Sequence, residues 1–260
     1  MALRDRSKGG RIMLHIFATE EDVQGDLLRI TGPEVNHIRN VMRLKPGEEI
    51  SVSRGGDGRE YRYGIESFES DAVLCRLRFV KEKETELPVR VLLFQGLPKA
   101  DKMELIVQKA VELGAAEIIP VSMDRCVVKL DAAKAAKKTA RWQTIAESAA
   151  SQSKRGIIPK VQLPMTMKEA VRYANQETQL RVIPYELQKD DGSVKSYLES
   201  IQPGQAVSIF IGPEGGFTPE EVEMAKEAGI HPISLGNRIL RTETAGLAML
   251  SWLIYILEIH

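Results

Sequence analysis

The sequence predicts an α/β protein in which a small N-terminal β-barrel precedes a larger domain built on a mainly parallel sheet. Short β-rich segments joined by tight turns occupy residues 13–82, whereas strands and helices alternate from residue 88 to residue 260. Such alternation is typical of a parallel sheet covered by helices on both faces. The charged stretch 81–88 between them ends in proline and marks a domain boundary. We therefore expect two domains, 13–82 and 88–260.

Composition and charge exclude several kinds of site. The 260 residues contain 36 basic and 36 acidic side chains, so a nucleic-acid partner would have to be bound by a local patch. Cys75 and Cys126 lie far apart and outside any C-x-x-C pattern, so we expect neither a metal site nor a disulfide, which fits a reducing cytoplasm. We recognise no signal or transit peptide and no membrane span, and we expect residues 1–12 to be a flexible expression remnant ahead of Met13.

In the N-terminal domain, alternating apolar patterns predict several short strands around one helix. A hairpin turn is expected at Gly55-Gly56-Asp57-Gly58, where three glycines surround an aspartate. The predicted strands cover residues 27–31, 49–53, 60–68 and 72–80, and the helix covers residues 33–41.

In the C-terminal domain, strands and helices follow one another with clear start and stop signals. Asp131 is placed to cap a long helix, and Gly114 and Gly156 are placed to end helices. Strands are predicted at 89–94, 116–121, near 161, at 180–184, 207–211 and 233–235, and helices at 101–113, 132–153, from 167, from 193, from 219 and at 244–258.

Two strand-to-glycine-loop-to-helix units stand close together near the C-terminus. The strand 207–211 ends in Gly-Pro-Glu-Gly-Gly at 212–216, and the strand 233–235 runs into Gly236-Asn237. Glycine lets a backbone turn sharply and approach a ligand, and open α/β sheets bind ligands at the carboxyl ends of their strands. The alternative is an ordinary glycine-rich turn, because neither a dinucleotide fingerprint nor a P-loop is present. The polar residues crowded at 241–244 favour a ligand site.

Three segments together resemble the SPOUT methyltransferases, and most closely the RsmE family of bacterial 16S ribosomal RNA uridine N3-methyltransferases. They are Gln95-Gly-Leu-Pro-Lys99 with Gln108–Gly114, Ile211-Gly-Pro-Glu-Gly-Gly216, and Leu235-Gly-Asn-Arg-Ile-Leu-Arg-Thr-Glu-Thr-Ala245. The resemblance runs from about Met13 to the C-terminus. It implies a PUA-like RNA-binding domain at 13–82 and a SPOUT domain whose C-terminal segment forms a deep trefoil knot.

The resemblance also implies the cofactor S-adenosylmethionine, which carries an activated methyl group and needs neither a metal nor a covalent enzyme intermediate. In SPOUT proteins this cofactor is held mainly by backbone groups. The contacts carried over to this chain are Gly96, Leu97, Pro98, Ile211, Gly212, Pro213, Glu214, Gly215, Gly216, Leu235, Gly236, Ile239, Leu240, Thr242 and Thr244.

Methylation at uracil N3 requires loss of the N3 proton, which a base or a stabilising cation can assist. We assign Arg241 as the cation that stabilises the developing charge and Glu243 as a candidate base. An equally good interpretation of Glu243 is an acidic residue placed near a helix start by the helix dipole.

The expected partners are 16S ribosomal RNA, free or in the assembled small subunit, and a second copy of the chain. Residues 122–160 contain nine basic and three acidic side chains, and the RNA candidates are Arg125, Arg155 and, in the first domain, Arg43. Lys134, Lys137 and Lys138 also fit a solvated helix face. The apolar surface of the helix 244–258 predicts a homodimer, which SPOUT relatives form through this region.

Two other functions remain open at this point. The chain could be a SPOUT enzyme with a different product, such as a ribose 2′-O-methyl or guanine N1-methyl group. It could also be a ribosome-assembly factor that binds RNA without catalysis, although the intact glycine loops argue against this.

Overall fold

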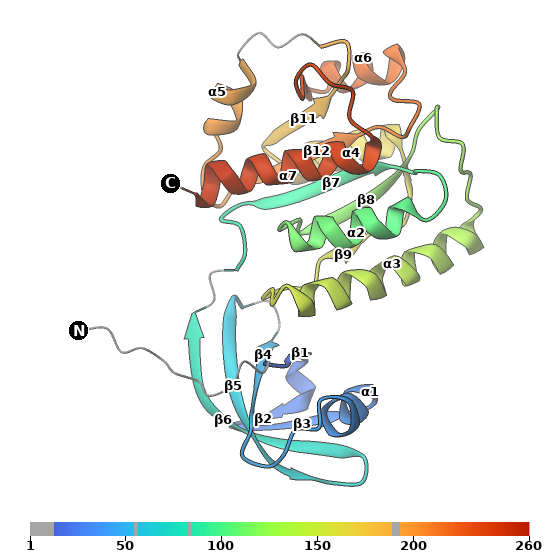
Figure 1. Ribbon diagram of the computed structural model, residues 1–260. Coiled ribbons are helices and arrows are strands. Elements are labelled where there is room, and N and C mark those ends of the chain that lie inside the picture. Colours follow the sequence, from blue (N-terminus) through green and yellow to red (C-terminus); the bar gives the residue numbers. More distant parts are fainter. Residues whose placement is uncertain (1–12, 55–56, 83–84, 189–192, 260) are drawn as a thin grey trace. The chain divides into compact units, whose positions relative to one another are not determined.

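The computed structural model describes residues 13–54, 57–82, 85–188 and 193–259, and the chain divides into two compact units (Figure 1). The first unit runs to Glu84 and also includes Lys154–Ile157, whereas the second comprises Thr85–Ser153 and Ile158–His260. The division at residue 84 falls inside the stretch 81–88, but the assignment of residues 154–157 to the first unit was not predicted from the sequence. Residues 1–12 and the first two residues of the expected hairpin turn lie outside the described residues.

The first unit is a six-stranded sheet packed on one apolar core. Its strands lie in the order β1-β4-β5-β6-β3-β2, with β1 parallel to β4 and the other pairs antiparallel. Ile38, Ile50 and Tyr63 are among the fully buried side chains of this core. The elements are β1 (His15–Ala18), the 3-10 turn η1 (Glu20–Asp22), β2 (Val23–Gln24), β3 (Leu27–Thr31), α1 (Pro33–Asn36), η2 (His37–Val41), β4 (Glu49–Arg54), β5 (Arg59–Phe68) and β6 (Ala72–Glu82).

Two details of this unit differ from the sequence-based expectation. The sequence predicted a small barrel, and among the described residues no hydrogen-bonded pairing joins β2 to β1, so the two ends of this sheet are not paired with each other. The helix expected at 33–41 is one α-helical turn followed by the π-helix η2, in which the Met42 N–H donates to the His37 carbonyl at 2.8 Å. The wider turn ends at Arg43, whose φ of 53° is uncommon for a residue other than glycine.

The second unit is a parallel sheet, as the alternating pattern predicted. Its strands lie in the order β10-β8-β7-β12-β11-β13, with β9 also on β8, and every pair is parallel. The elements are β7 (Arg90–Gly96), α2 (Lys102–Glu112), β8 (Glu117–Ser122), α3 (Ala132–Gln152), β9 (Lys160–Val161), β10 (Met165–Thr166), α4 (Met167–Glu177), β11 (Leu180–Pro184), α5 (Ser193–Glu199), β12 (Ala206–Ile211), α6 (Pro219–Glu227), β13 (His231–Ile233) and α7 (Thr242–Glu258).

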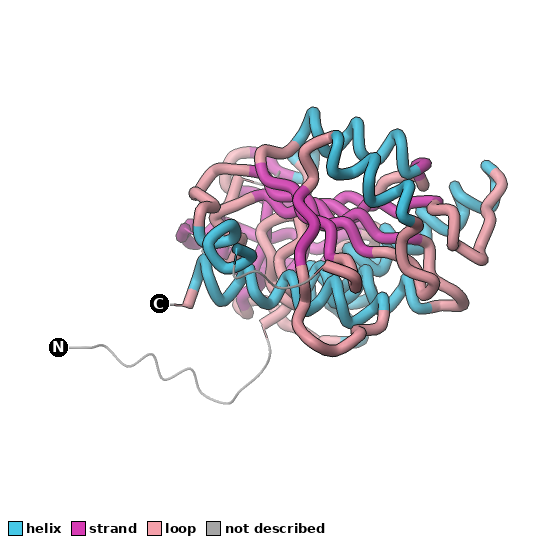
Figure 2. The backbone as a smooth tube through the Cα atoms, turned by 90° about the horizontal axis from the view of Figure 1, so that it is seen from above, coloured by secondary structure: helices cyan, strands magenta, loops and turns pink. Residues whose placement is uncertain are grey.

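Helices cover both faces of this sheet, which explains its composition. Figures 1 and 2 show α2, α3 and α7 on one face and α4 on the other, and α2 packs against both α3 and α7. The central strands β7 and β12 are therefore apolar runs rather than alternating ones, and every residue of β12 is buried. Phe94 and Phe210 stack between them with ring centroids 4.3 Å apart. No described helix, α7 included, is long and apolar enough to cross a membrane.

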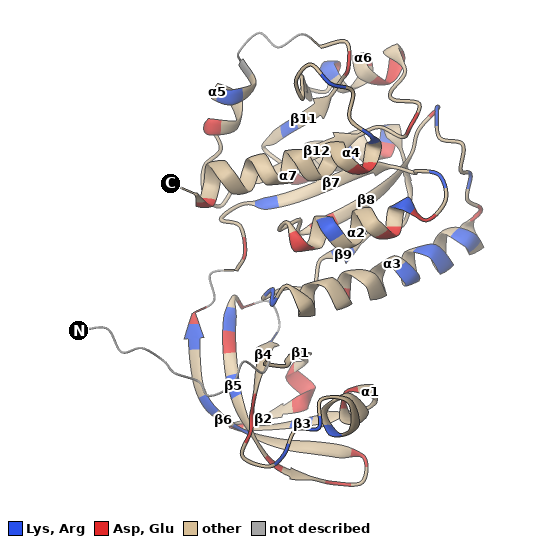
Figure 3. Ribbon diagram, viewed as in Figure 1, with Lys and Arg blue, Asp and Glu red and all other residues tan. Residues whose placement is uncertain are grey.

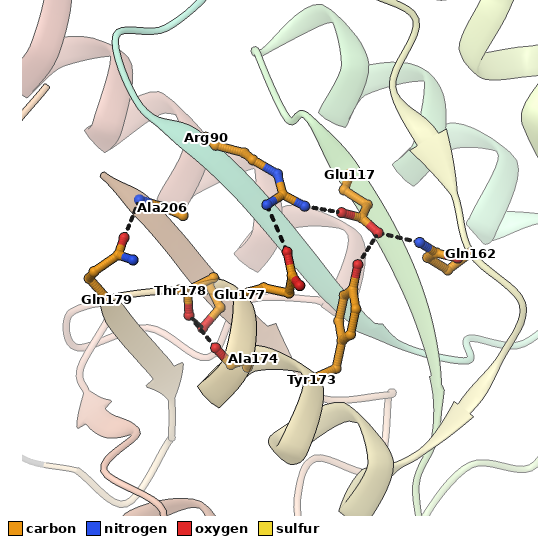
Figure 4. Close-up of polar contacts among 10 residues, drawn as sticks. Arg90, Glu117, Gln162, Tyr173, Ala174, Glu177, Thr178, Gln179 and Ala206 are labelled. Atoms are coloured by element: carbon orange, nitrogen blue, oxygen red, sulfur yellow. Dashed lines mark hydrogen bonds and ion pairs between the residues drawn. The ribbon is translucent and has the colours of Figure 1, made fainter. Parts of the chain in front are cut away.

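A polar network joins the amino-terminal ends of β7 and β8 to α4 (Figure 4). The buried carboxylate of Glu117 accepts hydrogen bonds from Arg90 at 2.8 Å, from Tyr173 at 2.8 Å and from Gln162, and Arg90 also bonds Glu177 at 2.9 Å. Burial and the hydrogen bond to Glu117 raise the pKa of Tyr173 to about 12. At the amino-terminal ends of these strands the polar groups are thus paired with one another. A ligand is therefore expected at the opposite side, among the loops that follow the carboxyl ends of the strands.

Candidate functional site

A pocket of about 650 Å³ opens where the carboxyl ends of β11, β12 and β13 meet. Its walls come from residues within 184–188, 211–217 and 234–242, completed by Lys102 of α2 and Ala245 of α7. Both glycine loops singled out in the sequence, at Gly212 and Gly236, line this pocket. The parallel topology therefore brings the two loops to one site, as expected for strands whose carboxyl ends share an edge.

The loop after β12 turns tightly over the end of β7. Gly216 has a φ of 68°, and its N–H donates to the Pro213 carbonyl at 2.9 Å. A β-carbon on Gly96 would lie only 2.7 Å from two atoms of Pro213, so glycine is required for this close approach. The capping box of α6 follows, in which Thr218 accepts from the Glu221 N–H at 3.2 Å and the Glu221 carboxylate accepts from the Thr218 N–H at 2.9 Å, confirming the sequence prediction.

A buried chain of hydrogen bonds fastens three segments of the site together. The Gln95 Nε2 donates to Thr242 Oγ1 at 2.8 Å, and Thr242 Oγ1 donates to the Gly212 carbonyl at 2.6 Å. Gln95 is fully buried and Thr242 nearly so. One turn further along α7, a β-carbon on Gly246 would lie 3.6 Å from side-chain atoms of Ile211 and Leu93, so α7 packs directly on β12 and β7. The end of β7, the glycine loop and the start of α7 are thus held in one arrangement.

Lys102 joins two carboxylates at the edge of the pocket. Its Nζ lies 2.9 Å from Glu214 Oε1 and 3.3 Å from Glu243 Oε2, and the Lys99 N–H also donates to Glu214. Burial disfavours the charged form of Glu214, but the bonds from Lys102 and Lys99 outweigh it and lower the pKa of Glu214. The hydrogen bond with Glu214 in turn raises the pKa of Lys102. Lys102 and Glu214 therefore both stay charged near neutral pH.

Arg241 is placed at the boundary between the second glycine loop and α7. It is the N-cap residue of α7, with its carbonyl accepting from the Thr244 and Ala245 N–H groups at 2.9 Å. Its exposed side chain lines the pocket, so a permanently charged guanidinium faces the space where a ligand would lie.

Most of the residues expected to bind a ligand line the pocket, and several others line it that the sequence did not indicate. The expected residues that line it are Ile211, Gly212, Pro213, Glu214, Gly216, Leu235, Gly236, Ile239, Leu240, Arg241 and Thr242. Those that do not are Gly96, Leu97, Pro98, Gly215, Glu243 and Thr244. The additional lining residues, outside the expected segments, are Lys102, Pro184, Tyr185, Glu186, Gln188, Phe217, Ser234 and Ala245. Asn237 and Arg238, which also line the pocket, belong to the expected second glycine loop.

The segment after β11 is the main element that sequence reasoning missed. The strand 180–184 was expected, but its place next to β12 was not, so Tyr185 and Glu186 gave no sign of facing the glycine loops. The signal available was the polar run that follows this strand. Gly96 lies close against Pro213 of the first glycine loop, and Leu97 continues the pairing of β7 with β8 through its N–H at 2.9 Å from the Val121 carbonyl.

The three arginines expected to meet RNA have different surroundings. Arg125 is exposed and donates to the Gly215 carbonyl at 2.9 Å, so it lies against the outer side of the glycine loop. Arg43 is exposed at its positive-φ turn. Arg155 is only 2% exposed and belongs to the first unit, which corrects the expectation of a loop arginine open to phosphates. His15 is also buried, with Nδ1 at 2.9 Å from Ser51 Oγ.

The described residues contain no group of three or more His, Cys, Asp or Glu side chains arranged to hold a metal ion. The pocket instead offers backbone groups, small side chains and a few charges, which suits an organic ligand.

Comparisons with known proteins give a consistent result for both units. A family model described as an RNA methyltransferase domain matches residues 85–254, and one described as an RNA methyltransferase PUA domain matches residues 30–78. The ribosomal RNA small subunit methyltransferase E of Bacillus subtilis is 40% identical over 88% of this chain and 90% of its own length. That of Aquifex aeolicus is 31% identical over 92% of this chain and 98% of its own length.

A solved structure of the Neisseria gonorrhoeae ribosomal RNA small subunit methyltransferase E bound to S-adenosyl methionine is similar to this chain. The two are 31% identical and superpose with a TM-score of 0.81, over 94% of this chain and 98% of that one.

Replacement of Thr242 tests whether the hydrogen-bond chain holds the site together. Thr242→Val keeps the side-chain volume but leaves the Gly212 carbonyl without its donor, and we expect the free energy of unfolding to fall by about 1–3 kcal/mol. Thr242→Ser keeps the hydroxyl and should lose clearly less. Urea denaturation of the three proteins measures this difference, and equal losses in both variants would show that packing, not the hydroxyl, is what matters.

Proposed function

Because the chain belongs to the ribosomal RNA small subunit methyltransferase E family, we propose that it methylates N3 of a uridine in 16S ribosomal RNA, using S-adenosylmethionine bound in the pocket. The observation that carries this proposal is the pocket itself, with its two glycine loops at the carboxyl ends of parallel strands. The proposal includes a trefoil knot formed by the C-terminal segment. When the two ends of the chain are pulled apart, the knot would tighten, and the stretched chain would be shorter from end to end than an unknotted chain of the same length.

The residues that would hold the cofactor fit a nucleoside-containing ligand. S-adenosylmethionine supplies an activated methyl group when bound. The glycine loops leave backbone groups accessible: beside Gly216 the nearest atom to a β-carbon would be Glu186 Oε1 at 4.0 Å, and beside Gly236 no atom lies within 4 Å. The carboxylate of Glu186 faces this space as an acceptor for hydroxyl groups. Gly96, Leu97 and Pro98 would contribute indirectly, by holding the first glycine loop in place.

Gly236→Val tests the assignment of the cofactor site. The added side chain would enter open space at the pocket wall, and we expect S-adenosylmethionine affinity to fall by about tenfold or more, the size expected when a ligand position is blocked. Gly204→Val is a matched control, since Gly204 also has a positive φ, 84°, and open surroundings, but it does not line the pocket. Calorimetric titration gives both affinities. Equal affinities for the two variants would show that the cofactor does not bind in this pocket.

Arg241 is the residue we assign to the chemical step. Uracil N3 must lose a proton, and negative charge then develops on the neighbouring carbonyl oxygens, where a fixed cation lowers the barrier. The Arg241 guanidinium lines the pocket and cannot accept a proton, so its role is electrostatic. Glu243 does not line the pocket and is ion-paired with Lys102, which supports a structural role at the helix start over that of a general base.

Arg241→Ala should lower the single-turnover rate by about a hundredfold or more, as expected for the loss of one preorganised donor. Raising the pH should partly restore the rate, because more of the uridine is then already ionised. Glu243→Gln should barely change the rate. The reaction is followed on unmethylated small subunits, and the modified nucleotide is mapped. Full activity of Arg241→Ala would overturn the role of that residue, whereas a methyl group on ribose or another base would overturn the reaction itself.

RNA recognition would use Arg125, beside the glycine loop, and Arg43 in the PUA-like unit. Arg125 is the better placed for the reaction, because its hydrogen bond to the Gly215 carbonyl holds it beside the first glycine loop. The target base must leave its stack to expose N3, so we expect the substrate to be a loop or an assembled ribosomal surface.

We propose that the protein is a homodimer formed through α7. Trp252 and Tyr255 of α7 are 36% and 65% exposed, and Leu105 of the adjoining α2 is 45% exposed, which leaves an apolar surface uncovered. A second copy would bury it, as the resemblance to SPOUT proteins implies.

Tyr255→Glu should shift the protein toward monomer by placing a charge inside this surface. Leu163→Glu is the control, because Leu163 is also exposed, at 57%, but lies away from α7 between β9 and β10. Light scattering at micromolar concentration distinguishes the states. A wild-type monomer that retains full activity would refute the dimer.

A further inference from the structure

The first half of α3 presents a row of cations on one side of the helix. Lys134, Lys137, Lys138 and Arg141 are spaced by three and four positions, which places them on a common face, in a row about 10 Å long. Figure 3 shows these basic residues along the amino-terminal half of α3. The single acidic residue of α3, Glu147, lies beyond them.

This arrangement is unfavourable for the helix that carries it. The amino-terminal turns of a helix attract acidic side chains and repel cations, because the backbone N–H groups there carry partial positive charge. Each of the four cations also lies three or four positions from two others, a spacing at which like charges repel. The helix forms nevertheless because Asp131 caps it, with its carboxylate 2.8 Å from the Lys134 N–H, and because Trp142 and Ala146 are buried. A locally unfavourable pattern of this kind indicates a functional surface.

Partners within the protein account for only part of this charge. Arg141 forms a two-pronged ion pair with Glu104 of α2, with both bonds at 2.8 Å, and is therefore used in packing. Within the part of the chain that the structure describes, the one carboxylate paired with Lys134 is that of the exposed Asp131. Lys137 and Lys138 have no carboxylate partner among the described residues, and the ammonium of Lys138 lies 5.9 Å above the Trp142 ring. We call Lys134, Lys137 and Lys138 the lysine stripe.

The lysine stripe belongs to the same unit as the pocket and is connected to it. Glu104, which Arg141 holds, lies in the first turn of α2, one half-turn from the pocket residue Lys102. The loop that leads from β8 into α3 carries Arg125, whose guanidinium bonds the glycine loop. Cationic side chains therefore lie both beside the first glycine loop and along α3 of the same unit.

We propose that the lysine stripe binds the phosphate backbone of the ribosomal RNA that flanks the target nucleotide. This inference rests on the proposed function and adds the surface on which the RNA lies. Lysine ammonium groups are donors without acceptor capacity and act on phosphates as point charges. The stripe therefore positions the RNA without reading its sequence.

The triple variant Lys134→Ala, Lys137→Ala, Lys138→Ala tests the proposal without endangering the fold. Alanine is the best helix former, and the substitutions remove like-charge repulsion, so the melting temperature should stay equal or rise. The matched control is Lys168→Ala, Lys195→Ala, Lys226→Ala, which removes three exposed lysines from α4, α5 and α6 of the same unit.

Binding to protein-free, unmethylated 16S ribosomal RNA and to unmethylated small subunits is measured over a series of salt concentrations. The slope of log affinity against log salt concentration should decrease by about two to three in the stripe variant, since each phosphate contact contributes about 0.7–0.9. Affinity at low salt should fall by at least about tenfold, while the control variant keeps wild-type values. The KM for RNA should rise, with kcat and S-adenosylmethionine affinity unchanged.

An unchanged salt slope in the stripe variant would overturn the proposal, as would an equal decrease in the control variant. Weaker binding to subunits with an unchanged slope for protein-free RNA would assign the stripe to a ribosomal protein and also overturn it. Failure of the proposed function is recognised separately. In that case the salt slopes of the wild-type protein and the stripe variant would still differ, but the wild-type protein would transfer no methyl group to uridine N3.

Discussion

The hydrogen-bond chain from Gln95 through Thr242 to the Gly212 carbonyl is the interaction on which the carboxyl edge of the sheet depends. Gln95 and Thr242 are 147 positions apart in the sequence, yet the three groups lie within bonding distance in an almost water-free interior. Moving Thr242 away would take one acceptor from the buried Gln95 amide and the hydroxyl donor from the Gly212 carbonyl, a large penalty in such surroundings. The position of the final helix and the shape of the glycine loop are therefore set together.

Local chemistry made much of the fold and part of the site predictable. The capping box at Thr218, the cap at Asp131 and the glycine loops are all encoded within a few neighbouring residues, and each is present as expected. Lys102 and the residues after β11 could not be predicted, because they reach the pocket only through the order of the strands. Arg155 was misjudged for a related reason, since nothing near it in the sequence shows that this turn belongs to the first unit.

Equal numbers of acidic and basic residues conceal two opposite uses of lysine. Lys102 forms ion pairs with Glu214 and Glu243, so its charge holds the start of α2, the first glycine loop and the start of α7 together. Lys137 and Lys138 of α3 instead have no carboxylate partner among the described residues, at positions where the helix itself disfavours them. A chain with no net charge can therefore still present a local field to a polyanion, because what matters is where the compensating carboxylates lie.

The inclusion of Lys154–Ile157 in the first unit affects how the protein is made. During synthesis, residues up to 84 are translated before β7, α2, β8 and α3, and the segment 154–157 is translated only after these. The N-terminal unit therefore cannot acquire its full set of contacts on emergence, although domains usually fold in the order of translation. It is also not a self-contained cassette, so its transfer to another protein by a single splice at residue 84 would leave part of it behind.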